Sequence, residues 1–240
     1  AAYDIVLKDY YNVNDIYPYY QAALSYGLVK KADKKVELLS NVMKASADAE
    51  FYPEAMFELG RTYVAKEEDD KAFECFSRMA EKVKDSTFVA RAYIEMGSLS
   101  RNQSQYNEAL GYYKTVVEQM PMSGYAEDAL AAIESIYQTR NQPDEYLDYI
   151  EAIGKGGIKT DDEKESMLFN SAEQIFLSEN YQKALVSLEA YLTQYPDGRN
   201  VYKAEFYIAE SYRMLGKFEQ ACDHYAEVIE GGEGSFVVLS

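Results

Sequence analysis

The residues that could do chemistry are few and scattered. His224 is the single histidine among 240 residues, and Cys222 lies two positions before it. On a helix this spacing points the two side chains to different faces, and a metal site would need two further ligands. Cys75 has no histidine beside it that could activate a thiolate. We therefore expect no catalytic, cofactor-binding or metal-binding residues. We interpret Cys75 and Cys222 as small core or boundary residues, and His224 as a solvated or packing residue.

The segment GKGGIKTDDEK, residues 154–164, is the stretch that could cradle a phosphate. A phosphate-binding loop has glycine directly before Lys-Ser/Thr and normally follows a strand. Here Ile158 precedes Lys159, and no strand is expected. We interpret the segment as a Gly-rich linker and a candidate hinge. Its acidic end, like EEDD at 67–70, marks a helix start where carboxylates favour the dipole. Neither acidic cluster has the ligand spacing of a calcium loop.

Charge and hydropathy limit the partners of this chain. It carries 41 acidic and 24 basic residues, a net charge of −17, so phosphate backbones would repel it and we expect no nucleic acid partner. No stretch approaches the roughly 20 apolar residues that span a bilayer, so we expect no direct membrane insertion. Two distant cysteines suggest no disulfide framework.

The elements that would position any site follow an internal repeat. Leu59, Gly60 and Tyr63 are followed by Ala72 and Phe76. Three further units keep this spacing, and two weaker units fill the gaps. The six units begin at 18, 53, 90, 126, 165 and 202, so the steps are 35, 37, 36, 39 and 37 residues. Apolar residues at three- and four-residue spacing predict two helices of about 14 residues in each unit, joined by a short polar turn.

This pattern resembles the tetratricopeptide repeat family, whose signature combines Leu-Gly, Tyr, Ala, a large aromatic residue and a closing Pro. The resemblance covers roughly residues 18–231 and implies an all-α fold, a right-handed α-solenoid (superhelix) of helix-turn-helix repeats. The early Trp position of the family is not kept. A glycine costs about 1 kcal/mol against alanine inside a helix. We therefore expect a partner helix to approach Gly60 closely.

The repeat spacing divides the chain as follows. We expect a second helix of a preceding, truncated repeat at 1–17, repeat 1 at 18–52, repeat 2 at 53–89, repeat 3 at 90–125, an irregular repeat 4 at 126–153, the linker at 154–164, repeat 5 at 165–201, repeat 6 at 202–235, and the start of a further repeat at 236–240. Neither end has a polar capping helix. We therefore expect an excerpt of a longer solenoid, whose uncapped ends could associate with each other.

The resemblance implies a protein-binding groove lined by the first helix of every repeat. Apolar and aromatic residues flanked by glutamates and a few arginines map to it, which suits protein or peptide partners of apolar and basic character. The candidate residues are Tyr26, Phe57, Glu58, Arg61, Ile94, Glu95, Arg101, Phe169, Glu173, Phe206 and Glu210. Alternatively, the apolar positions pack against the neighbouring repeat and the charges are solvated. The cationic set of a chaperone-tail clamp is absent.

Two functional classes are consistent with this sequence. The first is a non-catalytic scaffold or adaptor that binds partner proteins or peptides along the groove. The second is the recognition arm of a larger enzyme or regulator whose active domain lies outside these residues. The AMFELGRTYV form of a first helix and the Tyr-Pro-Asp-Gly ending at 195–198 also resemble long tetratricopeptide proteins of bacterial cell envelopes. That resemblance implies a periplasmic or envelope location and a role in envelope assembly, with the cytoplasm as the alternative.

Overall fold

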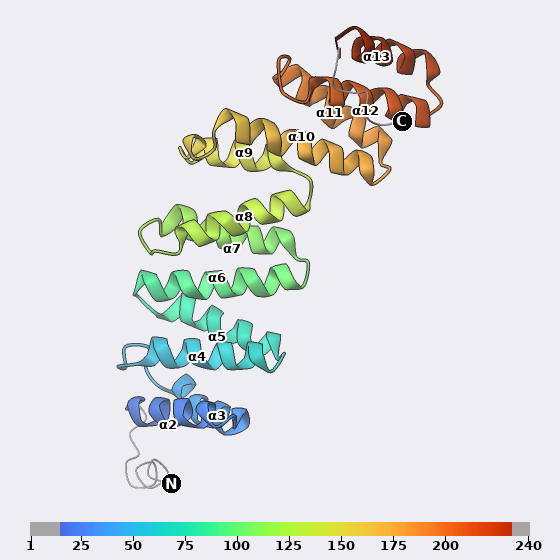
Figure 1. Cartoon of the computed structure of the whole chain (residues 1–240). Helices are drawn as coiled ribbons and strands as arrows, with labels where there is room; N and C mark the ends of the chain where they lie inside the picture. The colour runs from blue at the N-terminus through green and yellow to red at the C-terminus, as the bar shows by residue number, and fades with distance from the viewer. Residues whose placement is uncertain (1–14, 232–240) are drawn as a thin grey trace. The chain divides into compact units, whose positions relative to one another are not determined.

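A computed structural model describes residues 15–231, which form twelve α-helices, two short 3₁₀ turns and no strand (Figure 1). The predicted all-α class is confirmed for this part of the chain. The α-helices are α2 (Tyr17–Leu28), α3 (Ala32–Leu39), α4 (Tyr52–Ala65), α5 (Asp69–Lys82), α6 (Ser86–Asn102), α7 (Tyr106–Gln119), α8 (Ala126–Thr139), α9 (Pro143–Ala152), α10 (Asp161–Leu177), α11 (Tyr181–Gln194), α12 (Val201–Met214) and α13 (Phe218–Gly231). The 3₁₀ turns are Val42–Lys44 and Gly156–Ile158.

Two predicted end segments fall outside the described residues. The repeat start at 236–240 is one of them. The helix expected over 1–17 is the other, apart from residues 15–17, which the structure describes. There the structure corrects the prediction, because Tyr17 begins α2 and so belongs to the first helix of a hairpin. Pro18 favours this start, since proline fits the first turn of a helix, where its missing N–H is not needed.

The described residues divide into two compact units, one up to residue 133 and one from residue 134 on. In the first unit α2 packs against α3, α4 against α5 and α6 against α7, and α3 and α5 also contact the helices that follow them. In the second unit α10 packs against α11 and α12 against α13, while α11 also contacts α12. The division falls inside α8, in the irregular fourth repeat and before the predicted linker.

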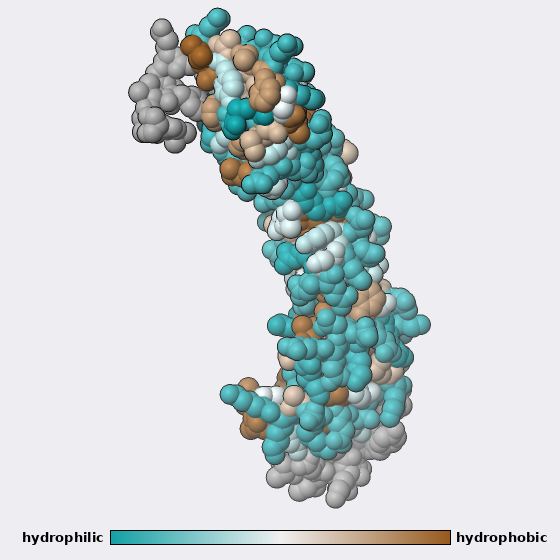
Figure 2. Space-filling model, turned by 90° about the vertical axis from the view of Figure 1, so that its right-hand side faces the viewer, coloured by the Kyte–Doolittle hydropathy of each residue, from teal (hydrophilic) through white to brown (hydrophobic). Residues whose placement is uncertain are grey.

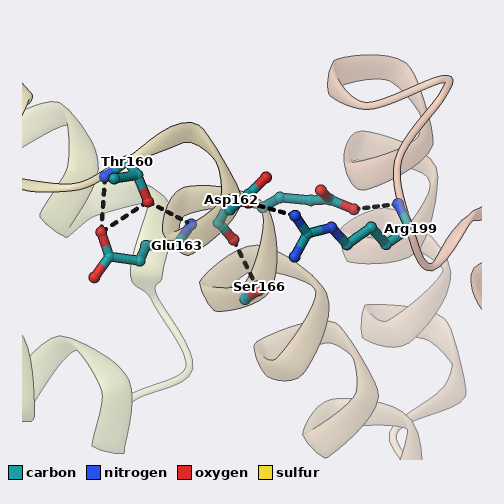
Figure 3. Close-up of polar contacts among 6 residues, drawn as sticks. Thr160, Asp162, Glu163, Ser166 and Arg199 are labelled. Atoms are coloured by element: carbon teal, nitrogen blue, oxygen red, sulfur yellow. Dashed lines mark hydrogen bonds and ion pairs between the residues drawn. The ribbon is translucent and has the colours of Figure 1, made fainter.

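Several helices differ from the expected length of about 14 residues. The α3 and α9 helices have 8 and 10 residues, whereas α6 and α10 have 17 each. Helix α10 begins at Asp161, so the last part of the predicted linker 154–164 is helical. Figure 3 shows why it begins there: Thr160 accepts a hydrogen bond from the Glu163 N–H, and the Glu163 carboxylate accepts one from the Thr160 N–H. Such a capping box satisfies two N–H groups that the helix leaves unpaired.

Each hairpin turn is closed by one residue in the left-handed conformation. These residues recur at steps of 37 or 38 and have φ between 52° and 74°; they are Lys30, Glu67, Ser104, Asn141, Glu179 and Gly216. The next amide donates to a carbonyl of the preceding helix, as Glu68 does to Tyr63 at 3.0 Å. This Schellman arrangement satisfies carbonyls at the end of a helix. The chain therefore reverses in the same way in every hairpin.

The first and second helices of a hairpin meet at the small residue of the repeat. A Cβ atom on Gly60 would lie 2.6 Å from Cε1 of Phe76, and Gly97 has the same relation to Tyr113. Phe76 has no exposed surface, and Tyr113 is 2% exposed. The close helix approach predicted at Gly60 is confirmed. It explains the glycine, because any side chain there would displace a buried ring.

Buried apolar residues from both helices of each hairpin form the cores. In the first unit the core includes Leu59, Phe76 and Met79, and in the second it includes Leu188 and Ile208, all fully buried. On the outside, hydrophilic residues cover much of the visible face, with separate hydrophobic patches among them (Figure 2).

Candidate protein-binding surface

The candidate residues lie on the first helices of their hairpins in both units. Tyr26 is on α2, Phe57, Glu58 and Arg61 are on α4, and Ile94, Glu95 and Arg101 are on α6. In the second unit Phe169 and Glu173 are on α10, and Phe206 and Glu210 are on α12. Residues three or four apart share a helix face. Phe57 and Arg61, Phe169 and Glu173, and Phe206 and Glu210 are each four residues apart and therefore share a face of their helix.

Two aromatic candidates are buried, which corrects the expectation that they line an open groove. Phe57 is 7% exposed and packs against Phe76, with ring centroids 5.8 Å apart. Phe169 is 2% exposed and lies between Tyr191 and Tyr207, at 5.3 and 6.5 Å. Phe57 also contacts Arg91 of α6, and Tyr207, which contacts Phe169, is on α12. In both cases the partner belongs to the following hairpin. For these two residues the alternative of packing against a neighbouring repeat therefore holds.

The other apolar candidates are half-buried. Tyr26 packs at the edge of the core of the first unit, and Ile94 is intermediate in exposure. Phe206 contacts Tyr225 of α13 with ring centroids 6.3 Å apart. These side chains stabilise the hairpins and leave only part of their surface to a partner.

Most candidate carboxylates are already paired inside the protein. Glu58 accepts a hydrogen bond from Lys35 of α3. Glu210 is held by the Arg213 guanidinium, with an Nη2 contact of 2.5 Å to Oε2, and it also accepts from the Tyr225 hydroxyl. The hydrogen bond from Arg213 holds the pKa of Glu210 below its ordinary value. These carboxylates already have hydrogen-bond partners within the protein, so they need no basic group from another protein.

Glu173 is the centre of a polar cluster between α10 and α12. It accepts from Lys203 Nζ at 2.7 Å and from the Tyr207 hydroxyl at 2.8 Å. Burial pushes the pKa of Glu173 up, but the hydrogen bonds from Lys203 and Tyr207 outweigh it and leave the pKa below its usual value. Burial, together with the bond to Glu173, raises the pKa of Tyr207 to about 12. Glu173 is thus ionised and Tyr207 neutral at pH 7.

Glu95 differs from the other candidate carboxylates. Burial raises its pKa, and the nearby charges of Arg61 and Arg91 only partly oppose this. Arg61 and Arg101, in contrast, are exposed on α4 and α6. These two guanidinium groups are the candidate side chains that a partner can reach freely.

A cleft in the first unit brings two candidates together with lysines that the repeat pattern did not identify. It has a volume of about 700 Å³. Its lining consists of Gly27, Lys30, Ala32, Lys35, Glu58, Arg61, Thr62 and Ala65. Lys30 and Lys35 come from the turn and second helix of the first hairpin. The lysine-rich run VKKADKK was the available signal for them.

A second cleft, of about 300 Å³, lies within the second unit. Its lining is mostly polar and uncharged, and comprises Gln138, Asn141, Pro143, Met167, Asn170, Ser171 and Gln174. None of the candidate residues lines it. The repeat pattern did not indicate this cleft, because its carboxamides come from the end of α8, from the turn that follows and from α10.

The chemically reactive residues are placed as follows. Cys75 is 1% exposed, and burial raises the pKa of its thiol to about 12, so its assignment as a core residue is confirmed. For Cys222 that assignment is wrong, because it lies on an exposed part of α13. His224 packs, as expected: its Nδ1 lies 2.6 Å from Glu205 Oε2, and its ring stacks on Tyr212.

Within residues 15–231, no three His, Cys, Asp or Glu residues are grouped so that they could hold a metal ion. In the same range no helix combines the length and the apolar character needed to cross a membrane.

Comparison with known proteins locates the repeat signature. A model of the tetratricopeptide repeat family matches residues 203–230, which include most of α12 and α13. The solved structure of the apo form of RapI is 15% identical, with 97% of this chain and 89% of that chain covered and a TM-score of 0.51. This likeness shows the fold. No curated protein matches the sequence.

Two further solved structures are similar at lower TM-scores. A tetratricopeptide repeat protein from Parabacteroides merdae is 13% identical, with 90% of this chain and 79% of that chain covered and a TM-score of 0.49. The pilF protein of Pseudomonas aeruginosa is 15% identical, with 92% and 93% covered and a TM-score of 0.44. The family match and the all-helical hairpin fold together support the tetratricopeptide repeat family, whose model matches residues 203–230.

Proposed function

We propose that this chain is a non-catalytic scaffold that binds protein or peptide segments, and that the cleft along α4 is one of its binding sites. The observation that carries this proposal is the 700 Å³ cleft, which contains the candidates Glu58 and Arg61. All but one of its lining residues are on helices α2, α3 and α4, so their backbone positions are set by helix packing. Such fixed backbone positions favour recognition of a peptide, because each group ordered on binding costs affinity.

The charges of the cleft indicate the kind of segment that fits. Lys35 is neutralised by Glu58, with which it forms an ion pair. Lys30 and Arg61 are exposed, and neither forms an ion pair with another described residue. The cleft thus has excess positive charge in a chain of net charge −17. A segment with a carboxylate near Lys30 and Arg61 fits it, whereas the basic partner expected from the sequence does not.

Selection from a displayed peptide library tests this proposal. The bait is the whole chain, and the selected peptides are then measured against a Lys30→Ala/Arg61→Ala variant. Arg101→Ala is the matched control, since Arg101 is also an exposed cation but does not line the cleft. We expect acidic peptides that lose about tenfold or more in affinity in the double variant, and keep it in the control. Their affinity should fall as salt is added. Equal binding to all three proteins would refute the proposed site.

We also propose that the scaffold acts in a bacterial cell envelope, in the periplasm, where it assists assembly. The support is the resemblance of AMFELGRTYV and of residues 195–198 to envelope tetratricopeptide proteins. Fractionation of the source cells with an antibody to this chain tests the location. Recovery in the cytoplasmic fraction alone would reject it.

A further inference from the structure

Helix α13 exposes a stripe of apolar residues. Phe218 is 66% exposed, Ile229 is 77% exposed and Cys222 is exposed between them. Their spacing of four and seven residues places all three on one helix face. Ala221, which is 2% exposed, marks the side that packs against α12. We call Phe218, Cys222 and Ile229 the α13 stripe.

Some positions of this helix face are buried in other hairpins. The repeat aligns Cys222 with Leu185 of α11 and Leu110 of α7, which are 3% and 7% exposed. It aligns Ile229 with Val117 of α7, which is 3% exposed. In the second unit α11 is covered on its far side by α12. Cys222 and Ile229 therefore stand at positions that are buried in α7, whereas the residues aligned with Phe218, Tyr106 and Tyr181, are half-buried.

A row of carboxylates runs beside the stripe. It consists of Glu219, Asp223, Glu227 and Glu230, and all four are exposed. Their spacing makes them helix neighbours, and like charges at this spacing repel. The last two also lie near the C-terminal end of α13, where negative charge opposes the helix dipole. Helix α13 contains no lysine or arginine, and within residues 15–231 none of the four forms an ion pair.

This acidic row contrasts with the carboxylates of the first helices. In the same unit Glu173 is paired with Lys203 and Glu210 with Arg213. Helix α9 is also acidic and free of lysine and arginine, but its large apolar residues Tyr146 and Ile150 are 1% and 0% exposed. Among the described helices, α13 thus combines unpaired carboxylates with an uncovered apolar face.

We propose that α13 binds an amphipathic helix of another protein, one with an apolar stripe and a flanking row of lysine or arginine. The apolar stripe would supply the buried contact and the acidic row would fix orientation and partner choice. Charge selects this occupant over a second copy of the chain, which would bring an identical acidic row. Charge also favours the basic helix over residues 235–240, SFVVLS, which carry no charged side chain.

The first test uses a synthetic helical peptide as probe. The peptide has leucines at positions matching the stripe and lysines at positions matching the acidic row. One control peptide has glutamate in place of lysine, and another has the same composition with the leucines scrambled. Fluorescence anisotropy with the whole 240-residue chain is expected to show at least about tenfold weaker binding of both controls. Equal binding of the scrambled peptide would overturn the proposal.

Variants of the chain test where the peptide probe binds. Phe218→Ser/Ile229→Ser should weaken binding about tenfold or more without unfolding the chain, because both residues are exposed. Glu219→Lys/Asp223→Lys should shift preference to the glutamate peptide. The matched control is Asp144→Lys/Asp148→Lys on α9, which makes the same charge change away from the stripe. If the α9 variant weakens binding as much as the α13 variant, the probe recognises only net charge and the proposal fails.

Two further measurements decide the occupant. The bound probe should slow maleimide modification of Cys222, the exposed thiol, while Cys75 stays unreactive in its core. Sedimentation should show a monomer whose mass does not change with concentration. A dimer that Phe218→Ser/Ile229→Ser dissociates would instead identify a second copy as the occupant. A tenfold rise in probe affinity after deletion of residues 235–240 would identify that segment, and either result would overturn the proposal. Lys30→Ala/Arg61→Ala should leave probe binding unchanged, which separates this surface from the α4 cleft.

Discussion

The guanidinium of Arg91 lies 3.7 Å from the centroid of the Phe57 ring. Phe76 packs on the same ring from the second helix of the hairpin. A cation over an aromatic face contributes about 0.5–2 kcal/mol, depending on how far it is removed from water. Phe57 therefore joins α4, α5 and α6 in the first unit, and its main role is to hold neighbouring hairpins together.

This relationship predicts different outcomes for Phe57 and Arg61, two candidates one turn apart on α4. Phe57→Ala should lower the free energy of unfolding by about 3–5 kcal/mol, because it leaves a cavity in the core. Arg61→Ala should change it by less than about 0.5 kcal/mol, since Arg61 is exposed. Urea unfolding followed by circular dichroism measures both. A Phe57→Ala protein as stable as the wild type would contradict the packing role.

Glycines on neighbouring helices provide a matched pair. A Cβ on Gly97 would lie 2.6 Å from Cε1 of Tyr113, whereas a Cβ on Gly111 would meet nothing within 4 Å. Gly97→Ala should destabilise by about 1–3 kcal/mol from overpacking, offset by the roughly 1 kcal/mol gain in helix propensity. Gly111→Ala should stabilise by about 0.5–1 kcal/mol. Thermal unfolding of both variants checks the pair, and stabilisation of both would show that the helices separate easily.

The hairpin turns predict stabilising substitutions. Ser104 is exposed and has φ of 60°, a conformation that costs roughly 1–2 kcal/mol for residues other than glycine. Glycine there also gains entropy in the unfolded chain, so Ser104→Gly should stabilise by no more than about 1 kcal/mol. The reverse change, Gly216→Ala, should destabilise by a similar amount, since Gly216 has φ of 74°. Unfolding midpoints that move in the opposite directions would disprove the left-handed turns.

Repeat spacing predicted the helix pairs and the contact at Gly60, because both depend on residues within one hairpin. The turn conformation could not be predicted in the same way. Glycine is the usual sequence signal for a left-handed turn residue. Gly216 is a glycine, but the corresponding residues Lys30, Glu67, Ser104 and Glu179 are not. Backbone groups form the hydrogen bonds of the Schellman turn, so the side chain of the turn residue does not have to be of one particular type.

The candidate site was predictable by helix but not by exposure. The register correctly assigned the candidates to first helices. Whether a candidate is free depends on the next hairpin, which places Arg91 over Phe57 and Tyr207 beside Phe169. The pairing of Glu58 with Lys35 likewise joins residues of neighbouring hairpins. Such contacts depend on side-chain positions that a single repeat does not encode.

Two glutamates predict opposite effects of pH on stability. The pKa of Glu95 is raised by burial, so its ionised form is disfavoured in the folded chain. Glu95→Gln should therefore raise the free energy of unfolding at pH 7. This gain should disappear below the unfolded-state pKa of about 4.3, where the wild-type residue is protonated in both states.

Glu173 is the control with the opposite sign. Its pKa lies below the ordinary value, because the hydrogen bonds from Lys203 and Tyr207 outweigh the effect of burial. Its ionised form therefore stabilises the fold above a pH of about 4.3, and this contribution is lost as pH falls through its lower folded-state pKa. Glu173→Gln should be less stable than the wild type at pH 7, with a difference that shrinks in acid. Urea unfolding at several pH values between about 3 and 7 measures the free energy of unfolding of both variants. One carboxylate is disfavoured by burial and the other is held by a lysine. Stability changes of the same sign in the two variants would therefore contradict the assigned environments.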